Sequence, residues 1–137
     1  MSFDEPFTAA ESALVVEARL CHLASVFMDG RPHVVPVSTV LDLNRIVFAS
    51  GYTQKIANIR ENPSVALCFD RYDEDWDQLQ QVIVYGEAYL VESGPEWERD
   101  RALLYEKFPQ YPVQAPIEEG TTTMVEVRIE SVSSFGL

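Results

Sequence analysis

The sequence is poor in basic residues, and this shortage excludes a class of partners. Ten lysines and arginines stand against 22 aspartates and glutamates, so the net charge is −12 and the pI is about 4.4. A chain of this charge repels nucleic acid phosphates and anionic lipid headgroups at long range. We therefore expect neither nucleic acid nor a membrane as a partner, and any bound phosphate must be held by a local arrangement of donors.

Cysteines and long hydrophobic runs are also scarce. The two cysteines, Cys21 and Cys68, lie within apolar stretches, which predicts buried thiols rather than a disulfide framework. No apolar run approaches the roughly 20 residues of a membrane span. Residues 1–5 lack the basic start and apolar stretch of a signal peptide, so we expect a cytoplasmic protein.

What remains is the composition of an ordinary folded domain. The 137 residues correspond to one domain, with 47% apolar and 23% charged residues. Seven Phe, six Tyr and two Trp are too many for a solvated coil, which excludes disorder as the main state. The sequence has no internal repeat, low-complexity tract or linker.

The first half of the chain predicts a helix followed by strands. The spacing of Thr8 and Glu11 is that of a capping box, and it predicts a helix over 8–19. Alternating apolar residues predict a strand over 20–28, a hairpin turn at Asp29-Gly30 and a return strand over 33–41. A turn at 42–44 and a strand over 46–49 would complete an antiparallel meander.

The second half alternates short helices with longer strands. The patterns predict a helix over 53–61, a strand over 65–69, an acidic loop over 70–77, a strand over 80–91, a helix from the Ser93–Glu96 capping box to about 108, a loop over 109–119 and a strand over 121–129. With about six strands, the fold class is mainly β. A small antiparallel barrel with peripheral short helices fits best, and a sandwich with flanking helices is the alternative.

The segment 48–59 carries the clearest chemical signal. A buried strand ends at Ser50-Gly51, and a helix begins near Thr53, where free backbone N–H groups favour anions. Lys55 lies in the first turn, where a cation opposes the helix dipole unless an anion occupies the site. The segment lacks the spacing of a P-loop. A phosphate site and a solvated surface lysine are the two interpretations.

Other candidate sites are weaker. Asp73, Asp75 and Asp77 have the spacing of an EF-hand start, but Gln78 and Val84 replace the required Gly and Glu, which favours a solvated loop.

Two histidines and the common nucleophile motifs complete the search. His22 and His33 would face each other across the first hairpin, yet no third ligand is placed by spacing, so we expect ordinary sheet residues. No nucleophile elbow or catalytic triad order is present. This favours a cofactor that supplies the chemistry, or no chemistry at all.

Several segments together resemble a known superfamily. These are Leu23-Ala24-Ser25-Val26, Gly30 to Val37, Ile46-Val47-Phe48, Lys55 to Leu67 with its Lys-x2-Asn-Ile-x2-Asn-Pro stretch, and Gln81 to Ala88. The chain resembles the split-barrel flavin-binding superfamily that includes pyridoxamine 5′-phosphate oxidase. Segments 70–76 and 107–112 resemble a narrower branch of probable deazaflavin (coenzyme F420)-dependent enzymes.

The resemblance implies a dimeric split β-barrel with two cofactor sites in the subunit interface, each binding FMN or coenzyme F420. It implies that the cofactor phosphate is held by the strand after the hairpin and by the segment that contains Lys55. The implied cofactor-binding residues, with none assigned to catalysis and none to a metal, are Val37, Ser38, Thr39, Ala49, Ser50, Thr53, Gln54, Lys55 and Gln81. Within this set, Gln81 and the Val37 backbone would contact the ring.

Some positions depart from the superfamily pattern. Gln54 stands where Arg is common, Ser38 and Thr39 replace a basic or aromatic pair, and residues 131–137 lack the substrate-binding Arg and His of the pyridoxamine oxidases. Vitamin B6 oxidation is therefore not expected. We expect hydride transfer between the cofactor and a small organic substrate. The alternatives are a non-catalytic module that binds flavin or haem, and a dimeric scaffold with a degenerate site.

Overall fold

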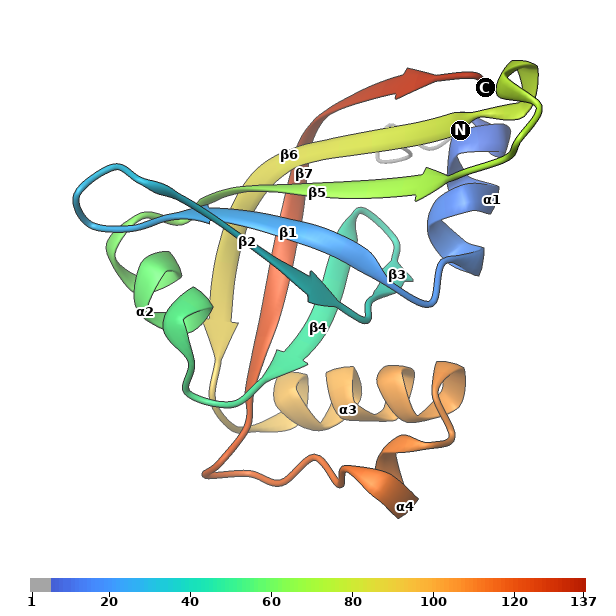
Figure 1. Ribbon diagram of the computed structural model, residues 1–137. Coiled ribbons are helices and arrows are strands. Elements are labelled where there is room, and N and C mark those ends of the chain that lie inside the picture. The colour runs from blue at the N-terminus through green and yellow to red at the C-terminus, as the bar shows by residue number, and fades with distance from the viewer. Residues whose placement is uncertain (1–5) are drawn as a thin grey trace.

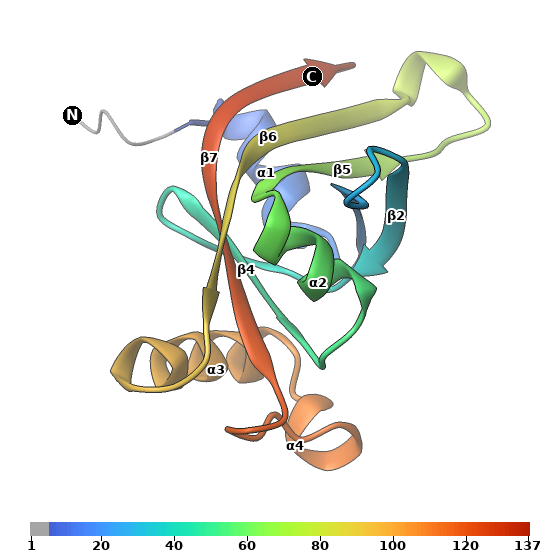
Figure 2. The same ribbon diagram turned by 90° about the vertical axis from the view of Figure 1, so that its left-hand side faces the viewer.

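A single curved antiparallel sheet forms the body of the protein, and helices lie at its periphery (Figures 1 and 2). The structure is a computed structural model that describes residues 6–137, so the prediction made on residues 1–5 lies outside the described part. The strands are β1 (Cys21–Val26), β2 (Pro32–Val37), β3 (Val40–Asp42), β4 (Arg45–Ser50), β5 (Ser64–Arg71), β6 (Gln80–Val91) and β7 (Thr123–Phe135). The helices are α1 (Ala9–Glu17), α2 (Gln54–Glu61), the 3₁₀ turn η1 (Trp76–Gln78), α3 (Pro95–Lys107) and α4 (Tyr111–Gln114).

The order of strands in the sheet explains why it curls into a barrel. The order is β2-β1-β5-β6-β7-β4-β3, so β2 and β3 are the two edges. Only Ser38 and Thr39 separate these strands in the chain. A link from Val37 to Val40 spans at most about 11 Å, so the edges must approach each other. The result is the predicted small antiparallel barrel, split along the seam between β2 and β3.

This seam corrects the strand predicted over 33–41. The residues up to Val37 pair with β1, whereas those from Val40 pair with β4 on the opposite edge. The run of valines gave no sign of the break, because both halves alternate apolar residues. The predicted three-stranded meander is therefore wrong: two hairpins, β1–β2 and β3–β4, stand in its place, and the sheet gains a seventh strand.

The helix boundaries are mostly as predicted, with one wrong cap. At α1 the Thr8 hydroxyl accepts from the Glu11 amide and the Glu11 carboxylate accepts from the Thr8 amide, which confirms the capping box. At α3 the N-cap is Gly94 with φ 94°, and no side chain caps it, so the predicted Ser93–Glu96 box is wrong. The predicted loop 109–119 contains the single-turn helix α4.

Two hydrophobic clusters fill the structure. The larger lies inside the barrel and includes Leu23, Phe48 and Phe69, each 0% exposed. The smaller packs α3 onto the outside of β4 and β7 around Trp97 and Met124. Burial of the thiol is confirmed for Cys21, which points inward, whereas Cys68 lies on the outer face and is half-buried. Within residues 6–137, no helix has both the length and the hydrophobicity that a membrane span requires.

A bulge shapes the longest strand pair. The β6–β7 register shifts between Tyr85 and Gly86, which bends both strands. A Cβ atom on Gly86 would lie 2.2 Å from the carbonyl oxygen of Arg128, a separation that no side chain can adopt. The backbones of β6 and β7 approach closely because this position carries no side chain.

This close approach makes Gly86 a test of the fold. We expect Gly86→Ala to destabilise the protein by at least about 1–3 kcal/mol, the cost of overpacking a filled interior. Gly51→Ala is the control, since a Cβ there meets no atom within 4 Å. Urea unfolding measures both variants, and equal midpoints for the two would contradict the assigned bulge.

Candidate functional site

The structure places the predicted cofactor-binding residues in three groups. Val37, Ser38 and Thr39 lie at the barrel seam. Ala49 and Ser50 end β4, and Thr53, Gln54 and Lys55 begin α2. Gln81 lies alone near the start of β6. The first two groups are neighbours through the β3–β4 hairpin, whereas the third is remote.

Three side chains converge where β4 leads into α2. Lys55 Nζ donates to Thr53 Oγ1 over 3.0 Å, and Ser50 Oγ lies 3.4 Å from the same Thr53 oxygen. Lys55 therefore folds back toward the start of its own helix instead of extending into water. The three side chains bring two hydroxyl groups and one ammonium group to a single point.

The start of α2 also leaves backbone donors free. Thr53 occupies the N-cap position, but its side chain accepts no capping bond from the helix amides. Among the described residues, the amides of Gln54 and Lys55 have no backbone acceptor. Such free N–H groups at a helix start favour an anion. The geometry is thus that of a small anion cradle.

The electrostatics of Lys55 point the same way. Within residues 6–137, no carboxylate lies within ion-pairing distance of its ammonium group, although acidic residues outnumber basic ones about two to one. Burial lowers the pKa of Lys55. A half-buried ammonium group without a counterion does not match the interpretation of a solvated surface lysine.

A buried amide holds α2 in place. Gln54 Nε2 donates to Asn58 Oδ1 over 2.7 Å, and Asn58 Nδ2 donates to Ser25 Oγ of β1 over 3.0 Å. Asn58 is 2% exposed and lies between Ile56 and Ile59 on the buried side of the helix. Sequence reasoning quoted Asn58 within a motif but gave it no role. A polar residue on an apolar helix face was the available signal.

Two shallow hollows adjoin the seam and the anion cradle. One, of about 240 Å³, is lined by Ala49, Ser50 and Gly51 on one side and by residues 115–117 on the other. The second, of about 260 Å³, is lined by Ser38 and the α4 region. Tyr111 and Ala115 line both hollows, so α4 lies between the two groups of predicted residues. Sequence reasoning missed Tyr111, because it took 109–119 as a loop.

At the seam, the hydrogen bonds are made mostly by neighbouring elements. Ser38 Oγ donates to the carbonyl of Arg19 over 2.9 Å. Thr39 is 2% exposed, and its carbonyl accepts from Lys107 Nζ over 2.8 Å. The same ammonium group donates to the carbonyl of Ala18 over 2.8 Å. Lys107, which sequence reasoning did not select, thus ties the end of α3 to the seam and to the end of α1.

Gln81 lies far from the other predicted residues. It pairs with Phe135 at one end of β7, whereas Ser50 pairs with Thr123 at the other end. Twelve residue steps along a strand correspond to roughly 40 Å. A separate hollow of about 310 Å³ adjoins Gln81, lined also by Tyr72 and Phe135. Gln81 and Ser50 of the same chain therefore line separate hollows.

The two histidines do not face each other. The β1–β2 register pairs His22 with Pro36 and His33 with Ser25, so the two side chains point to opposite faces of the sheet. The prediction that the two histidines face each other is therefore wrong, because the strand register pairs each of them with a different residue.

The acidic loop satisfies its own backbone. Asp73 and Asp75 accept from the amides two residues further on, over 2.7 and 3.1 Å. Residues 6–137 contain no group of three or more His, Cys, Asp and Glu side chains that could hold a metal ion.

The Lys107 contacts generate a prediction. We expect Lys107→Met, which keeps the length of the side chain, to destabilise the protein by about 1–3 kcal/mol, because two part-buried carbonyls lose their donor. The control is Arg60→Met, which removes a cation from an exposed ion pair with Glu92. Urea denaturation compares the two, and a Lys107→Met midpoint no lower than that of the control would refute the anchoring role.

The fold has many relatives among solved structures. A flavin adenine dinucleotide-binding protein from Mesorhizobium loti superposes with a TM-score of 0.75 at 23% identity, covering 93% of this chain and 94% of that one. An F420 reductase gives 0.74 at 22%, covering 93% and 98%. The haem storage protein HutZ from Vibrio cholerae gives 0.76 at 17%, covering 90% and 89%. At these identities the likeness shows the fold.

Sequence comparison identifies the family. Among curated proteins, none matches the chain. The family profile described as pyridoxamine 5′-phosphate oxidase matches residues 7–136, nearly the whole chain. The split barrel, the seam and the profile agree, and the chain belongs to the pyridoxamine 5′-phosphate oxidase family.

Proposed function

We propose that the protein is a flavin- or deazaflavin-dependent oxidoreductase that acts as a homodimer on a small organic substrate. The observation that carries this proposal is the anion cradle of Ser50, Thr53 and Lys55, with its unpaired ammonium group and free helix amides. Membership of the family and the likeness to a flavin-binding protein and an F420 reductase support it.

The residues present fit a cofactor that carries a phosphate. Lys55, Thr53 and Ser50 would bind the phosphate oxygens, and the amides at the start of α2 add two donors that need no side chain. The backbone at Val37 and the Ser38 hydroxyl lie at the seam, where a ring system could rest against α4. The bound cofactor would supply the hydride chemistry. The chain would bind it, orient it and exclude water.

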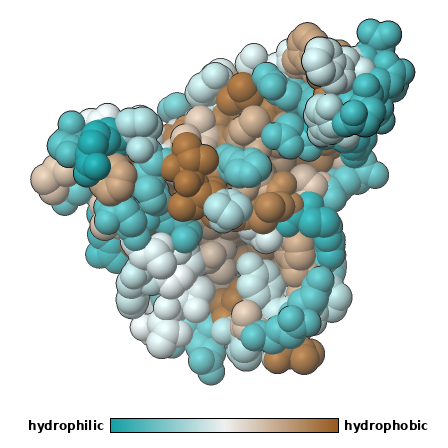
Figure 3. Space-filling view, viewed as in Figure 1, coloured by the Kyte–Doolittle hydropathy of each residue, from teal (hydrophilic) through white to brown (hydrophobic). Residues whose placement is uncertain are grey.

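The outer face of the sheet suits a second copy of the chain. Two adjacent rows of cross-strand neighbours on β2, β1, β5 and β6 carry no Lys, Arg, Asp or Glu. The first row is Pro36, His22, Cys68 and Ile83, and the second is Val34, Ala24, Ala66 and Tyr85. Figure 3 shows hydrophobic colour over the centre of this face, across β1 and β2. Depletion of charge is typical of the centre of an interface.

A dimer through this face would also give Gln81 a role. Asp70, Gln81 and Phe135 continue the outer face beside the charge-free rows. In one chain Gln81 is remote from the anion cradle. Twofold symmetry brings the same surface of two chains together, so the Gln81 hollow of one chain would meet the cradle of its partner. Each complete site would then contain residues from both chains.

A haem-binding module is the second candidate. HutZ shares this fold, and His22 lies exposed on the outer face of β1, where its ring could serve as an axial ligand. This candidate predicts a Soret band when the protein is titrated with haem, and loss of that band in His22→Ala. If the protein is instead a flavin- or deazaflavin-dependent enzyme, we expect no Soret band with haem and no effect of His22→Ala on one.

Cofactor titration tests the anion cradle. We expect saturable fluorescence changes with FMN or with coenzyme F420, and about ten- to hundredfold weaker binding by Lys55→Gln, the loss of one charge-assisted hydrogen bond. Arg60→Gln is the matched control, because it removes a cation from the exposed face of the same helix. No binding of either cofactor by the unmodified protein would overturn the proposal, and equal affinities for the two variants would place the phosphate elsewhere.

Mixed dimers test whether the site is shared between chains. Lys55→Gln and Gln81→Ala homodimers should each bind the cofactor weakly. In a mixed dimer of the two variants, one site combines both substitutions and the other has neither. We therefore expect half of the sites to bind with normal affinity. Uniformly weak binding by mixed dimers would show that Lys55 and Gln81 do not meet across the interface.

A further inference from the structure

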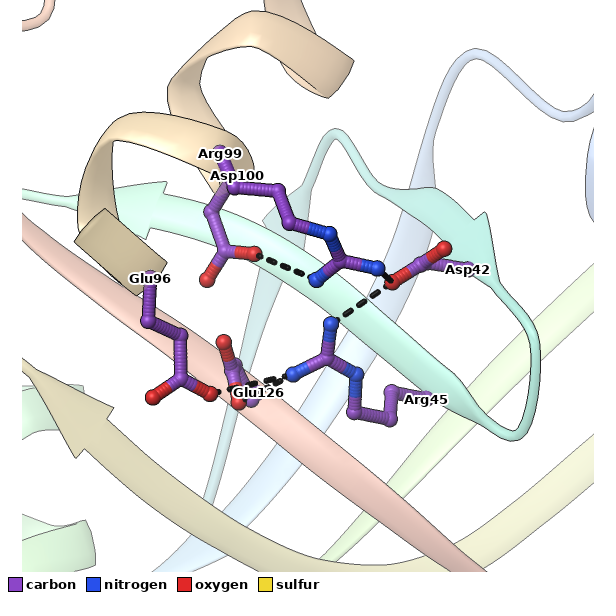
Figure 4. Close-up of polar contacts among 6 residues, drawn as sticks. All are labelled: Asp42, Arg45, Glu96, Arg99, Asp100 and Glu126. Atoms are coloured by element: carbon purple, nitrogen blue, oxygen red, sulfur yellow. Dashed lines mark hydrogen bonds and ion pairs between the residues drawn. The ribbon is translucent and has the colours of Figure 1, made fainter.

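A cluster of charged side chains docks α3 against the barrel at the Arg45 end of β4, whereas the anion cradle lies at the Ser50 end of that strand (Figure 4). It contains four carboxylates and two guanidinium groups, from Asp42, Arg45, Glu96, Arg99, Asp100 and Glu126. With every group ionised, the cluster would carry two uncompensated negative charges. Glu96 and Arg99 are half-exposed, whereas Asp100 and Glu126 are buried. Ionisation of both buried carboxyl groups is costly unless a proton or another cation relieves it.

Within residues 6–137, the hydrogen bonds of the two arginines leave both oxygens of Asp100 without a donor. Arg45 donates to Asp42 Oδ2 and to Glu126 Oε1, both over 2.6 Å, and more weakly to Glu96 over 3.2 Å. Arg99 also donates to Asp42. Its guanidinium group stays 4.0 Å from Asp100 Oδ1, beyond hydrogen-bond distance.

Asp100 and Glu126 are left facing each other. Asp100 is 0% exposed, and neither of its carboxyl oxygens has a hydrogen-bond partner among the described residues. Glu126 is 6% exposed, and its Oε2 also lacks a partner there. Figure 4 shows the Asp100 carboxyl of α3 and the Glu126 carboxyl of β7 pointing toward one another, and a hydrogen bond between the two affects the pKa of each. Two carboxylates can only accept, so a hydrogen bond between them requires a proton.

We propose that Asp100 and Glu126 share one buried proton at neutral pH, and that this proton makes the docking of α3 on the barrel pH-dependent. The inference goes beyond the proposed function, because it needs neither a cofactor nor a second chain. Burial of both groups raises their pKa values, which supports the assignment. The titration belongs to the pair rather than to either residue.

Charged side chains on α3 and β4 attract or repel the carboxyl groups of Asp100 and Glu126. From α3, Glu96 repels Asp100, and Arg99 attracts it. A hydrogen bond between Glu96 and Glu126 raises the pKa of Glu96 and lowers that of Glu126. From β4, Arg45 attracts both members of the pair.

Two more elements complete the surroundings. Asp42 of β3 draws both arginines toward itself. Tyr89 of β6 and Arg128 of β7 stand on the rim of a hollow of about 270 Å³ beside Glu126, with the Arg128 guanidinium 4.7 Å from the Tyr89 ring centre. This hollow gives protons and water a route to the edge of the cluster.

Release of the shared proton would act on the region beside the hollows. The chain leads from α3 directly to α4, whose Tyr111 lines the hollows next to Ser38 and Ser50. At this same C-terminal end of α3, Lys107 holds the seam. Two buried carboxylates in contact would repel each other and push α3 from β7. Loosening of α3 would therefore loosen α4 over both hollows.

The sign of the pH dependence follows from proton linkage. An unfolded carboxyl group loses its proton near pH 4, whereas the folded pair keeps one to a higher pH. Stability from this proton is therefore fully present below the unfolded pKa and falls as the pH rises through the folded pKa. For one retained proton, the unfolding equilibrium constant rises tenfold per pH unit between the unfolded pKa and the folded pKa.

Asp100→Asn isolates this effect, because an amide can donate to Glu126 as a protonated carboxyl does, but does not titrate. Urea unfolding of the full chain is measured from pH 5 to pH 9. We expect the unfolding constant of the unmodified protein to rise relative to that of Asp100→Asn by up to tenfold per unit. The control is Asp29→Asn, which removes a carboxylate from an exposed ion pair with Arg31. Its unfolding constant should change with pH in parallel with that of the unmodified protein. Parallel curves for Asp100→Asn would overturn the proposal.

A spectroscopic measurement on the unmodified, folded protein tests the proposal even if a substitution lowers the stability of the variant. Infrared difference spectra at pH 7 should show the carbonyl stretch of a protonated carboxylic acid in the unmodified protein and not in Asp100→Asn or Glu126→Gln. Hydrogen exchange of the α3 amides should accelerate as that band disappears with rising pH. A spectrum without an acid band at pH 7, or α3 exchange that does not follow the band, would contradict the shared proton.

Discussion

The rest of the structure depends on one geometric constraint: the two edges of the sheet are consecutive in the chain and are joined by two residues. This link closes the barrel without pairing its edges, so backbone polar groups at the seam must find partners elsewhere. Lys107 supplies one of those partners by donating to Thr39 and to Ala18. The same constraint therefore places Ser38 beside α4 and requires an anchor at the end of α3. Barrel closure and the location of the candidate site have a common cause.

Within the described part of the chain, the charged side chains divide into those with an ionic partner and those without one. Most arginines are consumed in ion pairs, including the Arg45 network beneath α3. Lys55 and Lys107 are not, and burial lowers the pKa of each. Lys107 meets two carbonyls, so its desolvation is offset within the chain. Among the described residues, Lys55 donates only to a threonine hydroxyl, so its desolvation is less completely offset. This contrast between two half-buried ammonium groups is the physical ground for assigning an anion to Lys55 alone.

Much of the fold could be predicted from local patterns, and the errors arise where pairing is non-local. The Thr8–Glu11 cap, the strand over 80–91 and the helix after Gly51 follow from spacing within a few residues. The break at Ser38 and Thr39 depends on which strands lie at the edges, which no local pattern records. Of the candidate site, the proximity of Ser50 and Lys55 could be predicted, because a strand end followed by a helix start is a local feature. That these residues bind a cofactor stays a prediction. Asn58 and Tyr111 act through contacts with β1 and across the hollows, so their roles emerged only in three dimensions.

The length of β7 gives the strongest argument for a site built from two chains. The strand runs from the Ser50 end of the barrel to the Gln81 end, and the bulge at Gly86 bends it without bringing those ends together. A single chain therefore holds an anion cradle and a separate hollow lined by Tyr72 and Phe135. Neither is enclosed, and neither alone could exclude water from a reaction. The charge-free sheet face lies next to the Gln81 hollow. The surface proposed for a second copy therefore adjoins the hollow that is remote from the cradle of the same chain.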